Sequence, residues 1–369
     1  MHFGLFCLMT QRQKGKRPGE IYRETVEHVQ MAEKVGFEIA WFAEHHFSNY
    51  CLCPSPMTMT SYMAGQTSTI KLGPAVIVAP LYEPIRLAED IGVADQLSNG
   101  RVVLGFGTGY QEYEFLKFGR DLKQSRRALF EVLDFVDAYL ANDPVVFKGD
   151  QFNMPETHFS VRPLQKRPSI YLAGMATDVD AQRRAAQRGY TPFFTTGWNS
   201  VDVIEKTRRG VEATYATAGG DPTRMPFAIQ RYLFVTENRE DALRAADGAR
   251  YIRRIAMAMR GKYGELEGAF LKEMPAADEP TLEEIVARLP IGDPETVADR
   301  LALDIEKLNP SHVSLFMAIP GLSQKEILTS MERFGAEVIP RLEQRFGDLR
   351  SIGHHPSPVV AVEMAIGQS

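Results

Sequence analysis

Lys71 to Gly105 reads KLGPAVIVAPLYEPIRLAEDIGVADQLSNGRVVLG and holds the pattern that decides the fold. A β-branched run at Lys71–Val78 is followed by a helical stretch at Pro84–Leu97, whose first residue is a proline. A second apolar run, Arg101–Gly105, follows directly. A strand, a helix and a strand in this order predict a βαβ unit with two parallel strands.

The same alternation continues in both directions from this unit. Eight strands are expected, at His2–Met9, Ile39–Ala43, Lys71–Val78, Arg101–Gly105, Ser169–Ala173, Tyr190–Thr195, Phe227–Val235 and His312–Met317. Helices are expected after them, at Glu20–Val35, Pro56–Gly65, Pro84–Leu97, Ser125–Ala141, Asp178–Arg188, Val201–Ala218, Arg239–Met259 and Gln324–Phe346. The alternation, unbroken in composition, predicts an α/β fold, a closed (β/α)8 TIM barrel forming a single domain over residues 1–350. A doubly wound open sheet is the disfavoured alternative, because it usually has fewer strands.

Two stretches interrupt the alternation. Asn142–Pro168 is polar and is expected to hold a short hairpin around Val145–Asn153. Lys262–Pro290, which lies between the seventh and eighth strands, is rich in Gly, Glu, Pro and Ala. Long insertions at the strand ends of a barrel commonly form lids, so we expect a lid here. Residues 351–369 are expected to form an extended C-terminal tail.

The overall composition excludes several classes of protein. With 44% hydrophobic and 24% charged residues and a net charge of −5, the chain lacks the basic field that attracts nucleic acid or an anionic membrane. No apolar run approaches the ~20 residues that span a bilayer. The opening Met1–Leu5 runs directly into a strand, without the charged and apolar segments of a signal peptide. We therefore expect a cytoplasmic enzyme.

The cysteines Cys7, Cys51 and Cys53 are too few and too odd in number for a disulfide framework. No second Cys/His pair stands at a zinc-like spacing from Cys51-x-Cys53. The adjacent His45 and His46 point to opposite faces of an extended chain. We therefore expect no metal site.

Active sites of (β/α)8 barrels lie at the carboxyl ends of the strands, so candidate residues are sought there. The second strand leads into Glu44-His45-His46-Phe47, whose titratable side chains are poor core formers and suit a barrel mouth. The structural alternative is a pair of histidines packed under a loop, and the residues themselves leave both interpretations open.

Glycines follow the fourth strand, in Gly105-Phe106-Gly107-Thr108-Gly109-Tyr110. They allow a flat ligand or a phosphate to approach the backbone closely. Their spacing is G-x-G-x-G rather than the G-x-G-x-x-G of dinucleotide sites, and no ribose-binding acid follows at the required distance. A dinucleotide site is therefore disfavoured.

The fifth strand leads through Ala173-Gly174-Met175-Ala176-Thr177 to Asp178 at the start of a helix. Free N–H groups there would seat a phosphate, and a simple Thr/Asp helix cap is an equally good interpretation. Side chains near other strand ends are candidates for a substrate pocket: Phe6, Tyr110, Trp198, Arg231 and Phe316.

Taken in order, these motifs resemble those of the bacterial-luciferase-like flavin-dependent monooxygenases. The similarity is dense over residues 1–120, looser through Ser169–Gly189, and returns at Ile291–Val297. The matching residues of the first part are Phe3-Gly4, Gly36-Phe37, Trp41, Glu44-His45-His46-Phe47, Leu72-Gly73, Pro80, Pro84, Arg86, Ala88-Glu89-Asp90, Asp95-Gln96-Leu97-Ser98, Gly100-Arg101 and Phe118-Gly119.

The resemblance implies that FMN, reduced by a separate NAD(P)H:flavin reductase, sits over the barrel mouth. Its C4a-peroxyflavin, formed with O2, would oxygenate a small organic substrate. His45 would be the catalytic base or hydrogen-bond donor, and a non-prolyl cis peptide of the family would fall at Ala75–Val76. Relatives are usually homodimers, which we expect here. The implied cofactor-binding residues are Glu44, Ala75, Val76, Gly107, Thr108, Ala173, Gly174, Met175, Ala176 and Thr177.

Departures from the family pattern narrow this expectation. Luciferases carry a Cys-Arg pair where this sequence has Gly107-Thr108. The missing cysteine argues against light emission, and the missing arginine transfers phosphate binding to the backbone amides and hydroxyls around Gly174–Thr177. Enzymes that use the deazaflavin F420 more often have Ser-Asp-His or Ala-Asp-His at Glu44-His45-His46, which favours FMN here. An F420-dependent hydride-transferring oxidoreductase and a non-catalytic flavin-binding protein are the alternatives.

Overall fold

Parallel strands at eight positions close into a barrel in the computed structural model, which describes residues 1–260 and 265–355. The third position is shared by two short strands, β3 and β4, and a bridge between Leu72 and Val102 joins β3 to the β5 side and closes the ring. The (β/α)8 barrel expected from the sequence is thus confirmed. Around the sheet the order is β3 (Lys71–Pro74), β2 (Ile39–Phe42), β1 (His2–Cys7), β15 (His312–Phe316), β10 (Ala228–Tyr232), β9 (Thr191–Thr195), β8 (Ile170–Ala173), β5 (Leu104–Gly107) and β4 (Ile77–Val78).

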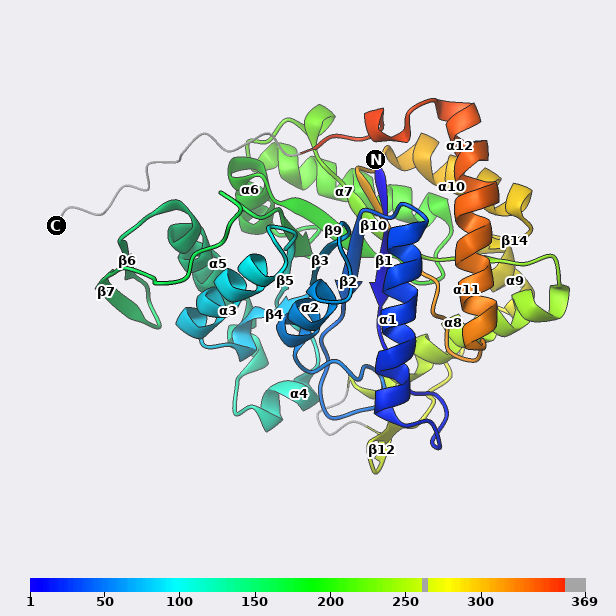
Figure 1. Ribbon diagram of the computed structural model, residues 1–369, viewed down its shortest axis with the longest axis horizontal. Coiled ribbons are helices and arrows are strands. Elements are labelled where there is room, and N and C mark those ends of the chain that lie inside the picture. Colours follow the sequence, from blue (N-terminus) through cyan, green and yellow to red (C-terminus); the bar gives the residue numbers. More distant parts are fainter. Residues whose placement is uncertain (261–264, 356–369) are drawn as a thin grey trace.

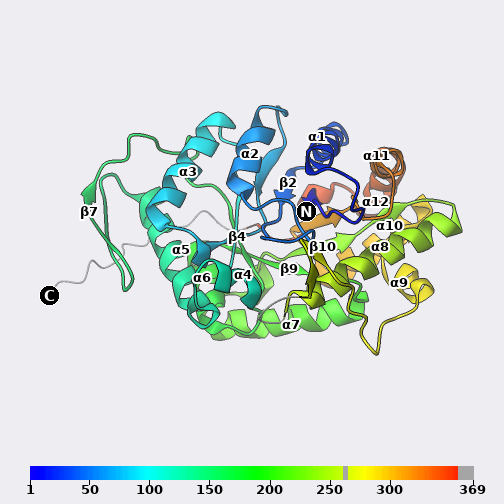
Figure 2. The ribbon, with the colours of Figure 1, turned by 90° about the horizontal axis from the view of Figure 1, so that it is seen from below.

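Alternate residues of each strand point into the barrel, as the two-residue period of a strand requires. Trp41, Tyr171 and Phe193 pack against one another inside it, with the Trp41 and Tyr171 ring centroids 4.9 Å apart. The opposite faces of the strands are covered by a ring of helices, which Figure 2 shows around the strands. The interior is therefore a packed core rather than a channel.

Most of the expected helices appear within two residues of their expected bounds. The helix that ends the described chain continues from α11 through a π-helical turn at Phe334–Val338 into α12. A helix that the sequence analysis did not anticipate, α10, precedes the last strand. The surrounding helices are α1 (Pro18–Lys34), α2 (Pro56–Ala64), α3 (Pro84–Leu97), α5 (Ser125–Ala141), α6 (Val179–Arg188), α7 (Val201–Thr217), α8 (Arg239–Ala258), α10 (Pro294–Leu308), α11 (Gln324–Arg333) and α12 (Ile339–Phe346).

Both interruptions of the alternation contain short elements. The expected hairpin is formed by β6 (Val145–Lys148) and β7 (Asn153–Thr157), and it projects from the barrel beside α3 and α5 (Figure 1). The expected lid segment holds a second hairpin, β12 (Leu266–Glu267) with β13 (Phe270–Leu271), and the helix α9 (Leu282–Arg288). Outside the barrel, β11 (Phe234–Val235) pairs with β14 (Ile291–Gly292). Residues 262–264 of the expected lid and 356–369 of the expected tail lie outside the described residues.

The amino end of the barrel is closed by the start of the chain. The Met1 amino group donates hydrogen bonds to the carbonyls of Leu349 and Ile352. Inside, the Trp41 indole N–H donates to His312 Nε2 at 2.8 Å. A Cβ on Gly4 would lie 2.6 Å from the His312 ring, so only glycine allows this ring to lie so close to β1. No helix within the described part of the chain is long and apolar enough to cross a membrane.

Candidate active site

The carboxyl ends of the strands form the opposite end of the barrel. In Figure 1 the β1 arrow points away from the N-terminus, toward the end where α4 (Glu112–Lys117) and the β12 hairpin lie. The chain leaves β2 directly into Ala43–Phe47, so Glu44, His45 and His46 stand at this end. Such placement is what a functional site in this fold requires.

His45 is held by a carboxylate that the sequence analysis did not identify. Glu114 Oε1 lies 2.9 Å from His45 Nδ1 and accepts the backbone N–H of His46, also at 2.9 Å. The Glu114 side chain is 2% exposed. A buried carboxylate at Nδ1 favours the tautomer with the proton on that nitrogen. His45 Nε2, which has no hydrogen-bond partner in the described residues, is then free to exchange a proton or a hydrogen bond with a ligand.

Glu44 and His46 turn away from this role and join the neighbouring strand. Glu44 Oε1 lies 3.0 Å from His46 Nε2, and Oε2 accepts the Val78 N–H and the Tyr82 hydroxyl, each at 3.0 Å. Burial, followed by the Glu44 charge, raises the pKa of Tyr82, which keeps that hydroxyl a donor. Both carboxylate oxygens of Glu44, which is expected to bind cofactor, are thus engaged by protein groups that link the chain after β2 to β4 and Tyr82.

Aromatic side chains surround the open side of His45. The Tyr50 and Tyr110 rings meet the imidazole edge-on, with centroids 4.7 Å and 5.7 Å away. At the ends of the neighbouring strands, Phe316 stacks on Tyr232 at 4.9 Å and meets Phe6 at 5.6 Å. Three of the expected pocket residues, Phe6, Tyr110 and Phe316, are thus at this end, and Tyr50 and Tyr232 join them.

The barrel wall beside His45 is irregular where β3 gives way to β4. The Ala75–Val76 peptide bond is cis, as the resemblance implied. On the adjoining β5, a Cβ at Gly107 would lie 2.8 Å from the Val76 side chain, so the absence of a side chain there lets the two strands approach closely. Ala75, Val76, Gly107 and the following Thr108 therefore form one continuous stretch of wall.

The turn between β8 and α6 leaves backbone donors free. Gly174 and Met175 are both left-handed, with φ of 73° and 59°. Among the described residues, no group accepts the N–H of Met175, Ala176 or Thr177. Asp178 caps α6 by accepting the Ala181 N–H. This cap confirms the Asp part of the helix-cap interpretation. An anion bound at the free N–H groups stays a prediction.

A guanidinium also reaches this turn, from the start of α5. Arg126 forms two hydrogen bonds to Asp178 and one to Asp180. It therefore neutralises carboxylates that would otherwise repel an anion at the free N–H groups. Arg126 was not among the residues identified from the sequence, because nothing in its neighbourhood along the chain connects it to the turn after β8.

Arg231 does not lie at the mouth, contrary to expectation. It is 1% exposed, its Nε bonds Asp304 of α10 at 3.0 Å, and its other nitrogens donate to the Asn199 and Arg288 carbonyls. Its neighbour Tyr232 points inward, so the alternation of the strand sends Arg231 outward to the helix layer. We remove Arg231 from the candidate pocket. Trp198, in the loop after β9, is half-buried against the main core.

Asn49 connects four segments at the mouth. Its amide nitrogen donates to the Gln11 carbonyl and to the Tyr251 hydroxyl of α8, at 2.8 Å and 2.9 Å. Its backbone N–H donates to the Ala269 carbonyl, and its side-chain oxygen accepts the Leu271 N–H. The loop that carries Tyr50 against His45 is therefore fastened to the β12–β13 hairpin of the insertion.

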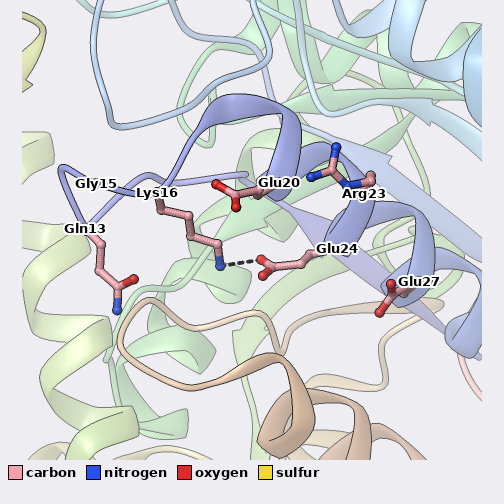
Figure 3. Close-up of a pocket in the computed structure, with 7 residues that line it drawn as sticks. All are labelled: Gln13, Gly15, Lys16, Glu20, Arg23, Glu24 and Glu27. Carbon is pink, nitrogen blue, oxygen red and sulfur yellow. Dashed lines mark hydrogen bonds and ion pairs between the residues drawn. The ribbon is translucent and has the colours of Figure 1, made fainter.

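A separate groove of about 540 Å³ opens on the surface beside the start of α1 (Figure 3). Its charged side chains include the ion pair of Lys16 with Glu24, and none of the expected site residues lines it. We assign it no ligand. Among the residues that the structure describes, no group of three or more His, Cys, Asp or Glu side chains is placed to hold a metal ion. The three cysteines are buried and unpaired.

The sequence of this chain is similar to those of a known protein family. Residues 1–311 match the model of the luciferase-like monooxygenase family. The chain belongs to this family. A protein called y4vJ from Sinorhizobium fredii is 33% identical to it over 349 residues, which cover 94% of this chain and 99% of that protein. The oxygenase component of the flavin-dependent trigonelline monooxygenase of Acinetobacter baylyi is 26% identical, with 95% of this chain and 98% of that protein covered.

Solved structures of other proteins have the same fold as this luciferase-like chain. The oxygenating constituent of 3,6-diketocamphane monooxygenase from Pseudomonas putida, in complex with FMN, superposes with a TM-score of 0.74 at 20% identity, covering 93% of this chain and 98% of that one. An F420-dependent secondary alcohol dehydrogenase superposes with a TM-score of 0.70 at 19% identity, covering 92% and 98%. At such identities the likeness extends to the fold alone.

Proposed function

We propose that this chain is the oxygenase of a two-component system, which uses reduced FMN and O2 to oxygenate a small organic substrate. The observation that carries the proposal is the His45–Glu114 pair, whose free Nε2 stands among aromatic rings at the mouth. The C4a-peroxyflavin route expected from the resemblance is part of the proposal. Bound FMN would supply the electrons that activate O2.

The residues of the mouth fit FMN at both ends of that molecule. The free N–H groups of Met175, Ala176 and Thr177, beside Arg126, would hold the phosphate. Nothing lies within 4 Å of the Cβ position of Gly174, so the turn is open to a ligand. The stretch of wall at Ala75, Val76, Gly107 and Thr108 would lie against the isoalloxazine ring, since its side chains are all small.

His45 would act on the substrate or on the reacting oxygen through Nε2. Glu114 holds the ring orientation through Nδ1, so that Nε2 could exchange a proton with a ligand at the mouth. The surrounding rings of Phe6, Tyr50 and Phe316 would exclude water from this exchange. The insertion at Lys262–Pro290 would act as the lid that completes this exclusion, and Asn49 fastens its β12–β13 hairpin to the mouth.

Two partners belong to the proposal. An NAD(P)H:flavin reductase would supply the reduced FMN, as the description of the trigonelline enzyme as an oxygenase component supports. A second copy of the chain would cover the exposed apolar side chains of Tyr62 on α2 and of Val93 and Leu97 on α3, giving a homodimer. We propose that the enzyme works in the cytoplasm.

The second candidate function is hydride transfer with F420, favoured by the structural likeness to the F420-dependent dehydrogenase. The third is flavin binding without catalysis. The test is a substrate screen with chemically reduced FMN under O2, read by mass spectrometry for the gain of one oxygen atom. Turnover under strict anaerobiosis with F420 would replace the first proposal by the second. Tight FMN binding with no oxygenated product from any substrate would favour the third.

A further inference from the structure

The arginines of α8 and of the turn directly after it fall into two groups. Four of them are neutralised by carboxylates within ion-pair distance. These pairs are Arg239 with Glu283, Arg244 with Asp241 and Glu326, Arg250 with Asp247, and Arg254 with Glu273 and Glu279. A paired arginine on a surface helix serves the fold and leaves little charge available to a ligand.

Arg253 and Arg260 form the second group. Both are exposed, and neither guanidinium group has a hydrogen-bond or ion-pair partner within residues 1–260 and 265–355. Arg253 lies in the last turns of α8 and Arg260 in the turn directly after it. Seven residues separate them, which is about two helical turns, so they lie on one side of this end of α8.

This end of α8 lies against the loop that follows His45. The Ser48 hydroxyl is 3.6 Å from Met259 Sδ, and the Asn49 amide bonds the Tyr251 hydroxyl. Desolvation raises the pKa of both Tyr232 and Tyr110. Against these larger effects, Arg253 lowers the pKa of Tyr232 and Arg260 lowers that of Tyr110. Tyr232 ends β10 and Tyr110 follows β5, so both tyrosines stand at the mouth.

The residue after Tyr110 has hydrogen-bonding groups without partners. Gln111, directly after Tyr110, is fully buried, and neither its amide nitrogen nor its amide oxygen has a hydrogen-bond partner in the described residues. The carboxylates of the mouth, Glu44 and Glu114, are already engaged by histidines and backbone N–H groups. The rim on the α8 side therefore has uncompensated positive charge beside neutral hydrogen-bonding groups.

We infer that the substrate of this site is an organic acid, whose carboxylate binds Arg253 and Arg260 while its apolar part extends past Tyr110 toward His45. A guanidinium binds a carboxylate through two parallel hydrogen bonds, and two of them would fix the orientation of a small molecule at the rim. This inference rests on the proposed function, because it names the class of molecule that the same mouth accepts.

The test measures binding with matched acids and amides, using benzoate and benzamide, nicotinate and nicotinamide, and octanoate and octanamide. Calorimetric titration of the full chain without flavin gives affinities that do not depend on oxygenase activity. We expect at least one acid to bind on the order of tenfold more tightly than its amide, and salt to weaken the acid only. Equal affinity within every pair, or no acid binding at millimolar concentration, overturns the inference.

Variants assign the effect to the two arginines. Arg253→Gln and Arg260→Gln should each weaken acid binding on the order of tenfold and leave amide binding unchanged. Arg239→Gln, at the other end of α8, is the matched control and should change neither affinity. The anion that binds the two arginines could instead be the phosphate of FMN. Titrations with FMN, which carries this phosphate, and with riboflavin, which lacks it, distinguish the two cases. If the two variants weaken FMN binding but not acid binding, the arginines serve the flavin phosphate and the inference fails.

Discussion

The two ends of the barrel each hold a histidine, and the two histidines differ in what their ring nitrogens contact. At the carboxyl end, His45 has a carboxylate at Nδ1 and leaves Nε2 free. At the amino end, His312 accepts the Trp41 N–H at Nε2, and its Nδ1 is buried without a partner in the described residues. Burial holds the pKa of His312 well below its usual range. The same side chain therefore has a ring nitrogen available to a ligand at one end and is a buried packing group with a lowered pKa at the other.

The largest effect expected from this difference is on turnover. Replacing His45 by Gln removes the proton-exchanging group, so the oxygenation rate should fall by about 10²- to 10⁴-fold. Glu114→Gln should lower it less and change its pH profile, because the amide keeps the contact but loses the charge. The measurements are single-turnover product formation and the thermal midpoint. Full activity in His45→Gln with a normal midpoint would remove His45 from the mechanism.

At the amino end the expected effect is on stability instead. His312→Leu keeps most of the volume but leaves the Trp41 N–H without an acceptor, which should cost about 1–3 kcal/mol in the free energy of unfolding. Urea denaturation measures this cost, and the activity of the folded fraction should not change. Trp41→Phe and the double variant complete a cycle, in which the two single costs should add to more than the double cost. Strict additivity would show that the hydrogen bond contributes nothing.

A smaller effect is expected from pH, again at the amino end. Burial lowers the pKa of His2 to about 4 and that of the Met1 amine to about 6. Both groups bind protons more weakly in the folded chain than in the unfolded chain. Their contribution to the free energy of unfolding is therefore fully present at high pH. It is lost as the pH falls from 8 to 6 for the amine and from 6.5 to 4 for His2.

We expect His2 to account for a loss on the order of 2 kcal/mol across its range. Urea midpoints from pH 8 to pH 4.5 measure it. His28 of α1, whose pKa burial lowers to about 4, titrates in the same range, so the comparison with His2→Gln isolates the amino end. An unchanged slope in that variant would place the acid sensitivity elsewhere.

The smallest effect is expected from lengthening the chain at its start. A Gly-Ser pair placed before Met1 turns the buried amine into an amide with a single N–H. It can then serve only one of the Leu349 and Ile352 carbonyls. The loss should be about 1 kcal/mol of stability, with unchanged turnover. A fall in turnover without a fall in stability would connect the amino end to the mouth and break the contrast between the ends.

The sequence was sufficient for the barrel, because strand and helix periods and the βαβ order are local properties. It located α3 and α5 to the residue, and the helix of Glu114 escaped it. That helix has six residues, too few for an amphipathic period, and its partner His45 lies far away along the chain. The hydrogen bonds of Asn49 could not be predicted from the sequence either, since all its partners are distant along the chain.

Arg231 shows a different limit. The sequence predicted a strand at Phe227–Val235, and the barrel strand β10 ends earlier, at Tyr232. The sequence also did not say which of two adjacent residues faces the interior, because that depends on the register with the neighbouring strands. Ala228 pairs with His312 and with Phe193, whose rings are inside, and this register sends Arg231 outward. A one-residue shift would have exchanged the two faces.

The Asn49 junction limits how this protein can be recombined. Four segments meet at one side chain and its backbone: the loop after β1, the loop after β2, α8 and the β12–β13 hairpin. A chimaera that takes its insertion from another member, to change which molecules it accepts, inherits three of these segments from one parent and the hairpin from the other. Breakpoints on either side of the hairpin will be tolerated only where the donor presents a carbonyl and an N–H in the places of Ala269 and Leu271.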